Sequence, residues 1–157
     1  MVNIPGNAVG QMVYAGGASF FRGNKAAGFA VARGDILVKD TGTTPDSYKL
    51  NAPGAAILGP FYIATQASTS AETGVSLANG GAWIVTGGDT IEPGDDVMMS
   101  TTVAGQTVKS TAVSTVAHLQ GKVGVSLGNA DTMGSQQTTA STVGQLYVLD
   151  LDAGYRG

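Results

Sequence analysis

The sequence predicts an all-β protein, a small barrel or sandwich of about nine short strands with an extended N-terminal arm and at most one short helix. Three observations predict this class. Glycine supplies 24 of the 157 residues, and Ala, Val, Ser and Thr dominate much of the rest, which favours turns and strands. A Gly-Asp pair twice precedes a short apolar run, at Gly34-Asp35 and at Gly94-Asp95. Turn signals also recur at the short spacing typical of all-β domains.

Each Gly-Asp pair is expected to mark the start of a strand. Glycine tolerates the positive φ that a tight turn requires, and an aspartate oxygen can accept a hydrogen bond within its own turn. Strands are therefore predicted directly after Asp35 and Asp95. The full set of strand-like runs from Gly28 onward is 28–32, 36–39, 57–65, 74–78, 82–86, 97–101, 106–109, 123–127 and 143–151.

A two-stranded hairpin is predicted around Asn79-Gly80-Gly81. This tripeptide lies between two apolar runs, and Asn-Gly favours the primed turn whose twist matches paired strands. The segment 111–120 has partial helical spacing and is the one candidate for a short helix. The polar tracts 68–73 and 135–142 are predicted to be exposed loops.

Internal similarity is faint by sequence. The two Gly-Asp pairs lie 60 residues apart, whereas the tetrapeptide at 74–77 recurs at 124–127 with an offset of 50. A duplication is expected to preserve one offset. The pattern is therefore interpreted as short segments that are common in β-strands, and not as a repeat architecture.

The N-terminal segment 1–27 is predicted to be an arm with a strand around 9–14. It is rich in Gly and Ala, and its apolar residues are too widely spaced by turn signals for a helix. The remaining residues, 28–157, are long enough to form one β domain with its own core. The expected division is thus an arm followed by a single domain.

Composition argues against several classes of function. The net charge is −3 and the eight Lys and Arg residues are scattered, so a basic face for nucleic acid is not expected. Cysteine is absent, which removes disulfide frameworks and most zinc sites. The sequence has no uninterrupted apolar run of about 18 residues, so no membrane-spanning helix is expected. The N-terminus lacks a basic segment followed by an apolar one, and we expect no signal peptide.

Catalysis is not expected either. Gly124, Ser126 and Gly128 match the spacing of a hydrolase nucleophile elbow. In that fold the histidine follows the serine, but the only histidine, His118, precedes Ser126, and no helical pattern follows. The protein is therefore expected not to be an enzyme.

A cofactor is not expected, and one metal site stays open. Four acids crowd a single turn region and together with backbone carbonyls could supply the oxygen ligands that calcium prefers, although no recognised loop spacing is present. They are Asp89, Glu92, Asp95 and Asp96.

The order of these motifs resembles the capsid decoration, or cement, proteins of tailed icosahedral viruses. An apolar arm leads to the first Gly-Asp strand, an aromatic strand follows, then a Gly-Gly turn, the second Gly-Asp strand and two closing strands. The segments that carry the resemblance are 10–15, 32–38, 59–64, 91–97, 121–127 and 143–149. None of them is a catalytic signature.

The resemblance implies a small β-rich protein, commonly a homotrimer, that binds the outer surface of an assembled capsid at capsomer junctions and stabilises the head. Its partner would be the major capsid protein, and its location the virion surface after synthesis in the host cytoplasm. The alternative is a receptor- or glycan-binding β-module of a virion appendage, for which Trp83 is the candidate stacking residue. Ordering of the arm on the capsid or on a neighbouring subunit would bury Val2, Ile4, Val9, Met12, Tyr14, Phe20 and Phe21.

Overall fold

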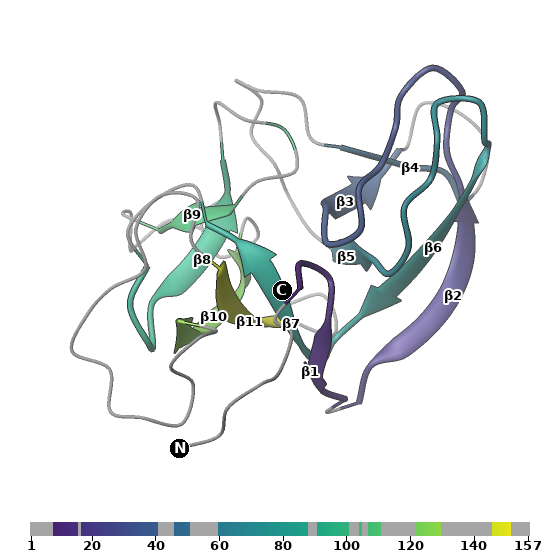
Figure 1. Cartoon of the computed structure of the whole chain (residues 1–157). Helices are drawn as coiled ribbons and strands as arrows, with labels where there is room; N and C mark the ends of the chain where they lie inside the picture. The colour runs from purple at the N-terminus through teal and green to yellow at the C-terminus, as the bar shows by residue number, and fades with distance from the viewer. Residues whose placement is uncertain are drawn as a thin grey trace.

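Two antiparallel sheets form the protein (Figure 1). The computed structural model describes residues 8–15, 17–40, 46–50, 60–87, 91–100, 104, 107–110, 122–129 and 146–151. Sheet A has the order β1 (Met12–Tyr14), β7 (Ala82–Thr86), β11 (Leu146–Leu151), β10 (Lys122–Asn129), β8 (Asp96–Met99) and β9 (Thr107–Lys109). Sheet B has the order β2 (Ser19–Asn24), β6 (Gly74–Asn79), β5 (Phe61–Ala64), β3 (Ile36–Lys39) and β4 (Tyr48–Leu50).

The two sheets repeat one topology. When the five strands of sheet B are numbered in chain order, they lie side by side in the order first, fifth, fourth, second, third. Strands β7 to β11 of sheet A, numbered in the same way, lie in the same order. In both sheets a single parallel bridge joins the end of the first strand to the start of the third, at Asn24–Ser47 and at Gly87–Thr107. Strand β1 is an addition to sheet A, beside β7. The expectation that the chain has no repeat architecture is therefore wrong.

The Gly-Asp turns are the best-matched part of this repeat. Gly34 donates to the carbonyl of Ala64 at 2.8 Å, and the amide of Ala64 donates to the carbonyl of Asp35 at 2.9 Å. Gly94 and Asp95 make the same two bonds with Ser126, at 2.7 and 2.9 Å. Both glycines have a positive φ, 91° and 87°. The predicted strand starts after Asp35 and Asp95 are confirmed by β3 and β8.

The all-β class is confirmed, with differences in detail. Seven predicted runs correspond to β3, β5 to β8, β10 and β11, and 106–109 corresponds to β9. The run 28–32 contains only an isolated bridge from Val31 to Ser68. Strands β2 and β4 were not predicted, because β2 mixes two phenylalanines with polar residues and glycine, and β4 is only three residues long. The candidate helix 111–120 and the tract 135–142 lie outside the described residues.

The predicted hairpin at Asn79-Gly80-Gly81 is wrong in its pairing. Gly80 and Gly81 do have positive φ values, 69° and 78°. However, β6 and β7 belong to different sheets, so this tight turn carries the chain from sheet B to sheet A. The Trp83 indole donates to the Gly80 carbonyl at 2.7 Å, and the Leu151 amide donates to the Gly81 carbonyl at 2.9 Å. These bonds hold the turn against sheet A.

The main core lies between the sheets. Ile36, Phe61 and Ile63 of sheet B belong to the same buried cluster as Trp83 and Tyr147 of sheet A, which is the arrangement of a small β sandwich. The opposite face of sheet B is buried too, around Leu37, Tyr48 and Leu77. Because both faces of sheet B are covered, β3 is apolar in three consecutive residues instead of alternating.

The described part of the predicted arm lies in both sheets. β1 pairs with β7, and β2 pairs with β6 over all six of its residues. Strand β1 at 12–14 agrees with the strand predicted around 9–14, whereas strand β2 at 19–24 differs from the extended arm expected there. Residues 1 to 7 lie outside the described residues.

Candidate interaction surface

The edge strand β1 presents two large apolar side chains to solvent. Met12 is 40% exposed and Tyr14 is 67% exposed, while Val13 between them packs against a small buried cluster that contains Ile84. This is the alternation of a strand with one covered face. Backbone bonds between Gly10 and Ile84, 2.7 Å, and between Ile84 and Gln11, 2.9 Å, hold the start of this segment on β7.

Strand β2 contributes a third exposed apolar side chain. Phe20 is 58% exposed, and its ring makes an edge contact with the Trp83 ring at 5.9 Å between centroids. Its neighbour Phe21 points to the other face of the sheet and packs edge-on against Tyr62, 5.5 Å away, and against Tyr48. Of this pair, only Phe20 is substantially exposed.

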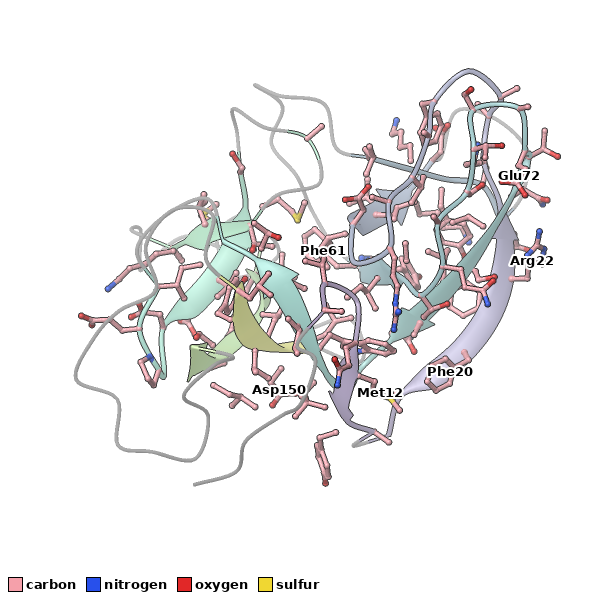
Figure 2. The ribbon with its side chains drawn as sticks, viewed as in Figure 1. Met12, Phe20, Arg22, Phe61, Glu72 and Asp150 are labelled. Carbon is pink, nitrogen blue, oxygen red and sulfur yellow. The ribbon has the colours of Figure 1, made fainter. Side chains whose placement is uncertain are left out.

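Met12, Tyr14 and Phe20 form one feature, which we call the apolar rim. Met12 and Tyr14 pair across the strands with Trp83 and Ala82, and Phe20 contacts the Trp83 ring, so all three are linked to the first two residues of β7. Figure 2 shows Met12 and Phe20 on neighbouring strands where the two sheets meet. At this edge the core itself is buried, and the three rim side chains lie exposed beside it.

The other predicted partner-binding residues have different positions. Val9 is half-buried and lies against Gly34: a Cβ added there would fall 2.2 Å from the Val9 Cγ1. Arg33 supports this contact by donating from Nε to the Gly10 carbonyl at 3.3 Å. Val2 and Ile4 lie outside the described residues. The structure thus brings together three of the seven predicted residues as an exposed group.

The acidic turn region is neutralised by lysines. Asp95 pairs with Lys109 at 3.0 Å, and Asp96 pairs with Lys122 at 2.8 Å. Asp95 also accepts a hydrogen bond from the Glu92 amide at 2.8 Å. Asp89 lies outside the described residues, and within the described ranges no three His, Cys, Asp or Glu residues are grouped as a metal site would require.

Ser126 lies inside the protein and not on an exposed turn. It is buried in β10, and its Oγ accepts a hydrogen bond from the Gly128 amide at 3.1 Å. A nucleophile elbow instead presents its serine to substrate at a strand-to-helix turn. His118 lies outside the described residues.

Trp83 is a core residue. It is buried beside β1 and donates its indole N–H to the Gly80 carbonyl, so its ring faces are not open for stacking on a sugar. The tyrosines of the two cores are similarly enclosed, and burial raises the pKa of Tyr48, Tyr62 and Tyr147. These residues serve packing.

Sequence reasoning missed a buried lysine. Lys25 is 3% exposed, and its Nζ donates to the carbonyls of Phe29 and Thr69, each at 2.9 Å, and of Glu72 at 2.5 Å. The ammonium also lies 5.0 Å from the centre of the Phe29 ring. It joins the loop after β2 to the loop before β6. No local sequence pattern predicts that Lys25 is buried and bonds three carbonyls, since its neighbours are small polar and Ala residues.

No helix among the described residues has the length and apolar content needed to cross a membrane. No protein-family model matches the chain, and no curated protein matches its sequence. Among solved structures, the chain is similar to the head fiber gp8.5 N base in bacteriophage phi29, with a TM-score of 0.57 and 16% sequence identity. The similarity covers 89% of this chain and 98% of that one. At this identity the likeness shows a shared fold, which extends over nearly the whole of the phage structure.

Proposed function

We propose that this protein is a structural component of a phage virion that binds the outer surface of the assembled capsid at capsomer junctions and stabilises the head. The observation that carries the proposal is the shared fold with a head fiber base, which extends over nearly all of that base. The order of motifs in the sequence leads independently to capsid decoration proteins. The function requires a binding surface and no catalytic step.

The apolar rim is the proposed contact with the major capsid protein. Full burial of a large apolar side chain contributes about 1.5 to 3 kcal/mol before ordering costs are deducted. Met12, Tyr14 and Phe20 together thus give a modest affinity for one copy. Many copies on one particle, each bound only to the assembled lattice, stabilise it by mass action.

A trimer is proposed as the bound form, following the decoration proteins that the sequence resembles. Each trimer would place three rims on one capsomer junction, and the three contacts would act as a single multivalent one. Sedimentation equilibrium of the purified protein tests this part separately. A monomer at all concentrations, both free and on heads, would exclude it.

The main experiment mixes purified protein with heads that lack it and images them by electron cryomicroscopy. We expect added density at capsomer junctions and cosedimentation of protein with heads. The Tyr14→Ser, Phe20→Ser double variant should bind at least tenfold more weakly. Leu127→Ser is the matched control, because Leu127 is also a 39% exposed apolar residue but lies on β10, away from the rim. Heads without added density would contradict the proposal.

A screen for glycan binding tests the alternative, a receptor- or glycan-binding module. A specific glycan hit combined with no binding to heads would favour that alternative. Because Trp83 is buried, such a hit would have to use other residues.

A further inference from the structure

We infer that the outer edge of β2 is an acceptor for one added strand, and that the occupant is an extended segment of the major capsid protein carrying an apolar residue beside Phe20 and a carboxylate beside Arg22. The inference rests on the proposed function. Its physical basis is the repeat itself, because the equivalent edge in sheet A is filled by β1.

The hydrogen-bonded registers establish which residues are equivalent. In sheet B, Ala64 bonds the Gly-Asp turn and pairs with Leu77, which in turn pairs with Phe21. In sheet A the same path runs from Ser126 through Leu149 to Trp83. Phe21 therefore corresponds to Trp83, and the next residue, Arg22, corresponds to Ile84.

Ile84 is one of the residues that hold the added N-terminal segment on sheet A, next to the β1–β7 pairs Met12–Trp83 and Tyr14–Ala82. Its carbonyl accepts from the Gly10 amide at 2.7 Å, and its amide donates to the Gln11 carbonyl at 2.9 Å. Strand β2 ends sheet B, and among the described residues no strand pairs with its outer side over residues 20–22. The position that β1 fills in one sheet is thus open in the other.

The backbone of β2 has the right polarity for this addition. The Asn24 amide points away from β6, since it donates to the Asp46 carbonyl at 2.8 Å. Backbone groups alternate in direction along a strand, so Phe20 and Arg22 also direct their N–H and C=O groups away from β6. An incoming strand would pair with these groups and would extend the apolar rim.

The side chains on this edge select the occupant. Phe20 is 58% exposed, and a strand placed beside it would cover the ring. Arg22 is exposed and donates to the Ser76 Oγ at 3.3 Å. The four ion pairs found between described residues use Lys39, Lys49, Lys109 and Lys122, and none uses Arg22. A cross-strand carboxylate would give Arg22 an opposite charge at the distance where such pairs are favourable.

The test uses three variants at one position and heads that lack the protein. Arg22→Pro removes the outward amide and sterically blocks the edge, while leaving the β6 side of β2 paired, a placement that edge strands tolerate. Arg22→Thr removes the charge but keeps the amide and is the matched control. Arg22→Glu reverses the charge, with Lys39→Glu, at the exposed last residue of β3, as its control. Thermal unfolding first verifies that each variant folds.

We expect Arg22→Pro and Arg22→Glu each to weaken head binding at least tenfold, with Arg22→Thr and Lys39→Glu weakening it less than threefold. For wild type, hydrogen exchange at the Phe20 and Arg22 amides should slow at least tenfold on heads, whether or not Arg22→Pro folds. If wild type binds heads but exchange at both amides is unchanged, the edge is not used and this inference fails while the proposed function stands. If concentration alone slows exchange in free protein, a second copy is the occupant and the inference also fails. If wild type does not bind heads, the proposed function fails and this inference with it.

Discussion

Asp35 and Asp95 make the same hydrogen bond in two different sheets. In each case an Oδ2 accepts from the backbone amide three residues earlier, Ala32 or Glu92, at 2.8 Å. The backbone amide of each aspartate also donates to the carbonyl of that same earlier residue, at 3.1 and 3.2 Å. In each repeat the carboxylate thus closes the turn that precedes the second strand, β3 or β8.

Loss of either carboxylate should destabilise the fold by a similar amount. Asp35→Ala and Asp95→Ala each remove one hydrogen bond, and we expect the free energy of unfolding to fall by about 1 kcal/mol in each. Urea denaturation monitored by Trp83 fluorescence measures this. The asparagine variants keep an acceptor oxygen and should lose less than half as much. An unchanged stability of both alanine variants would show that the turns do not depend on these bonds.

Asp35 should also give the protein a specific pH dependence. Burial raises the pKa of its carboxyl above the ordinary 3.8, and the bond from Ala32 opposes part of that rise. The folded state thus holds this proton more tightly than the unfolded state. The stabilising contribution is complete below pH 3.8 and is lost as the pH rises through the raised pKa. We expect the stability of wild type relative to Asp35→Asn to decline over that window and to be constant above it. A relative stability that rises with pH would contradict the assignment.

Two glycines in equivalent turns should tolerate alanine differently. Gly94 has a positive φ but open space around its missing Cβ, so Gly94→Ala should cost about 1 kcal/mol from backbone strain alone. At Gly34 a Cβ would also fall 2.8 Å from the Gly10 amide nitrogen. Gly34→Ala should therefore cost about 3 kcal/mol, because the N-terminal segment must move. Chemical denaturation compares the two, and equal losses would mean that residues 9 and 10 do not rest on this turn.

Replacement of Lys25 should be among the most damaging single changes. Lys25→Met removes the donor for three carbonyls and leaves them enclosed, so we expect a loss of about 3 kcal/mol. Lys39→Met is the control: its pair with Asp46 is exposed on both sides and should contribute less than about 0.5 kcal/mol. Thermal or urea unfolding measures both. Similar losses for the two lysines would exclude a special role for Lys25.

Two truncations should separate the contribution of β1 from that of residues 1 to 7. Deletion of residues 1 to 14 removes β1 and uncovers Ile84, so the truncated protein should lose several kcal/mol of stability or fail to fold. Deletion of residues 1 to 7 retains the bonds from Gly10 and Gln11 to β7 and should unfold within about 1 kcal/mol of wild type. Only the shorter deletion is therefore suitable for testing head binding.

The sequence was most informative where local chemistry determines the backbone. The strand starts after Asp35 and Asp95 were predictable because glycine φ and the aspartate acceptor act within four residues. The hairpin was not, since Gly80 and Gly81 adopt the expected φ values but the pairing of the flanking strands depends on the packing of two sheets. Local propensity therefore predicts the conformation of a turn but not which strands pair on either side of it.

The repeat was hidden by a coincidental match. The tetrapeptides at 74–77 and 124–127 lie on β6 and β10, which are the fifth strand of the first repeat (β2 to β6) and the fourth strand of the second (β7 to β11), so their offset of 50 has no structural meaning. The offset of 60 between the Gly-Asp pairs does relate equivalent turns of the two repeats. Of the candidate site, the exposed residues Met12, Tyr14 and Phe20 were predicted, whereas their convergence at the start of β7 depends on the contact between the two sheets.

The position of the Lys25 ammonium has a consequence for the ionic requirements of the fold. Loops that direct several carbonyl oxygens at one point often bind calcium, which chelators or dilution remove. Here the cation is covalently attached to the chain, so its local concentration is fixed by the bond and not by the surroundings. The contacts between this cation and its three carbonyls therefore need no dissolved metal ion.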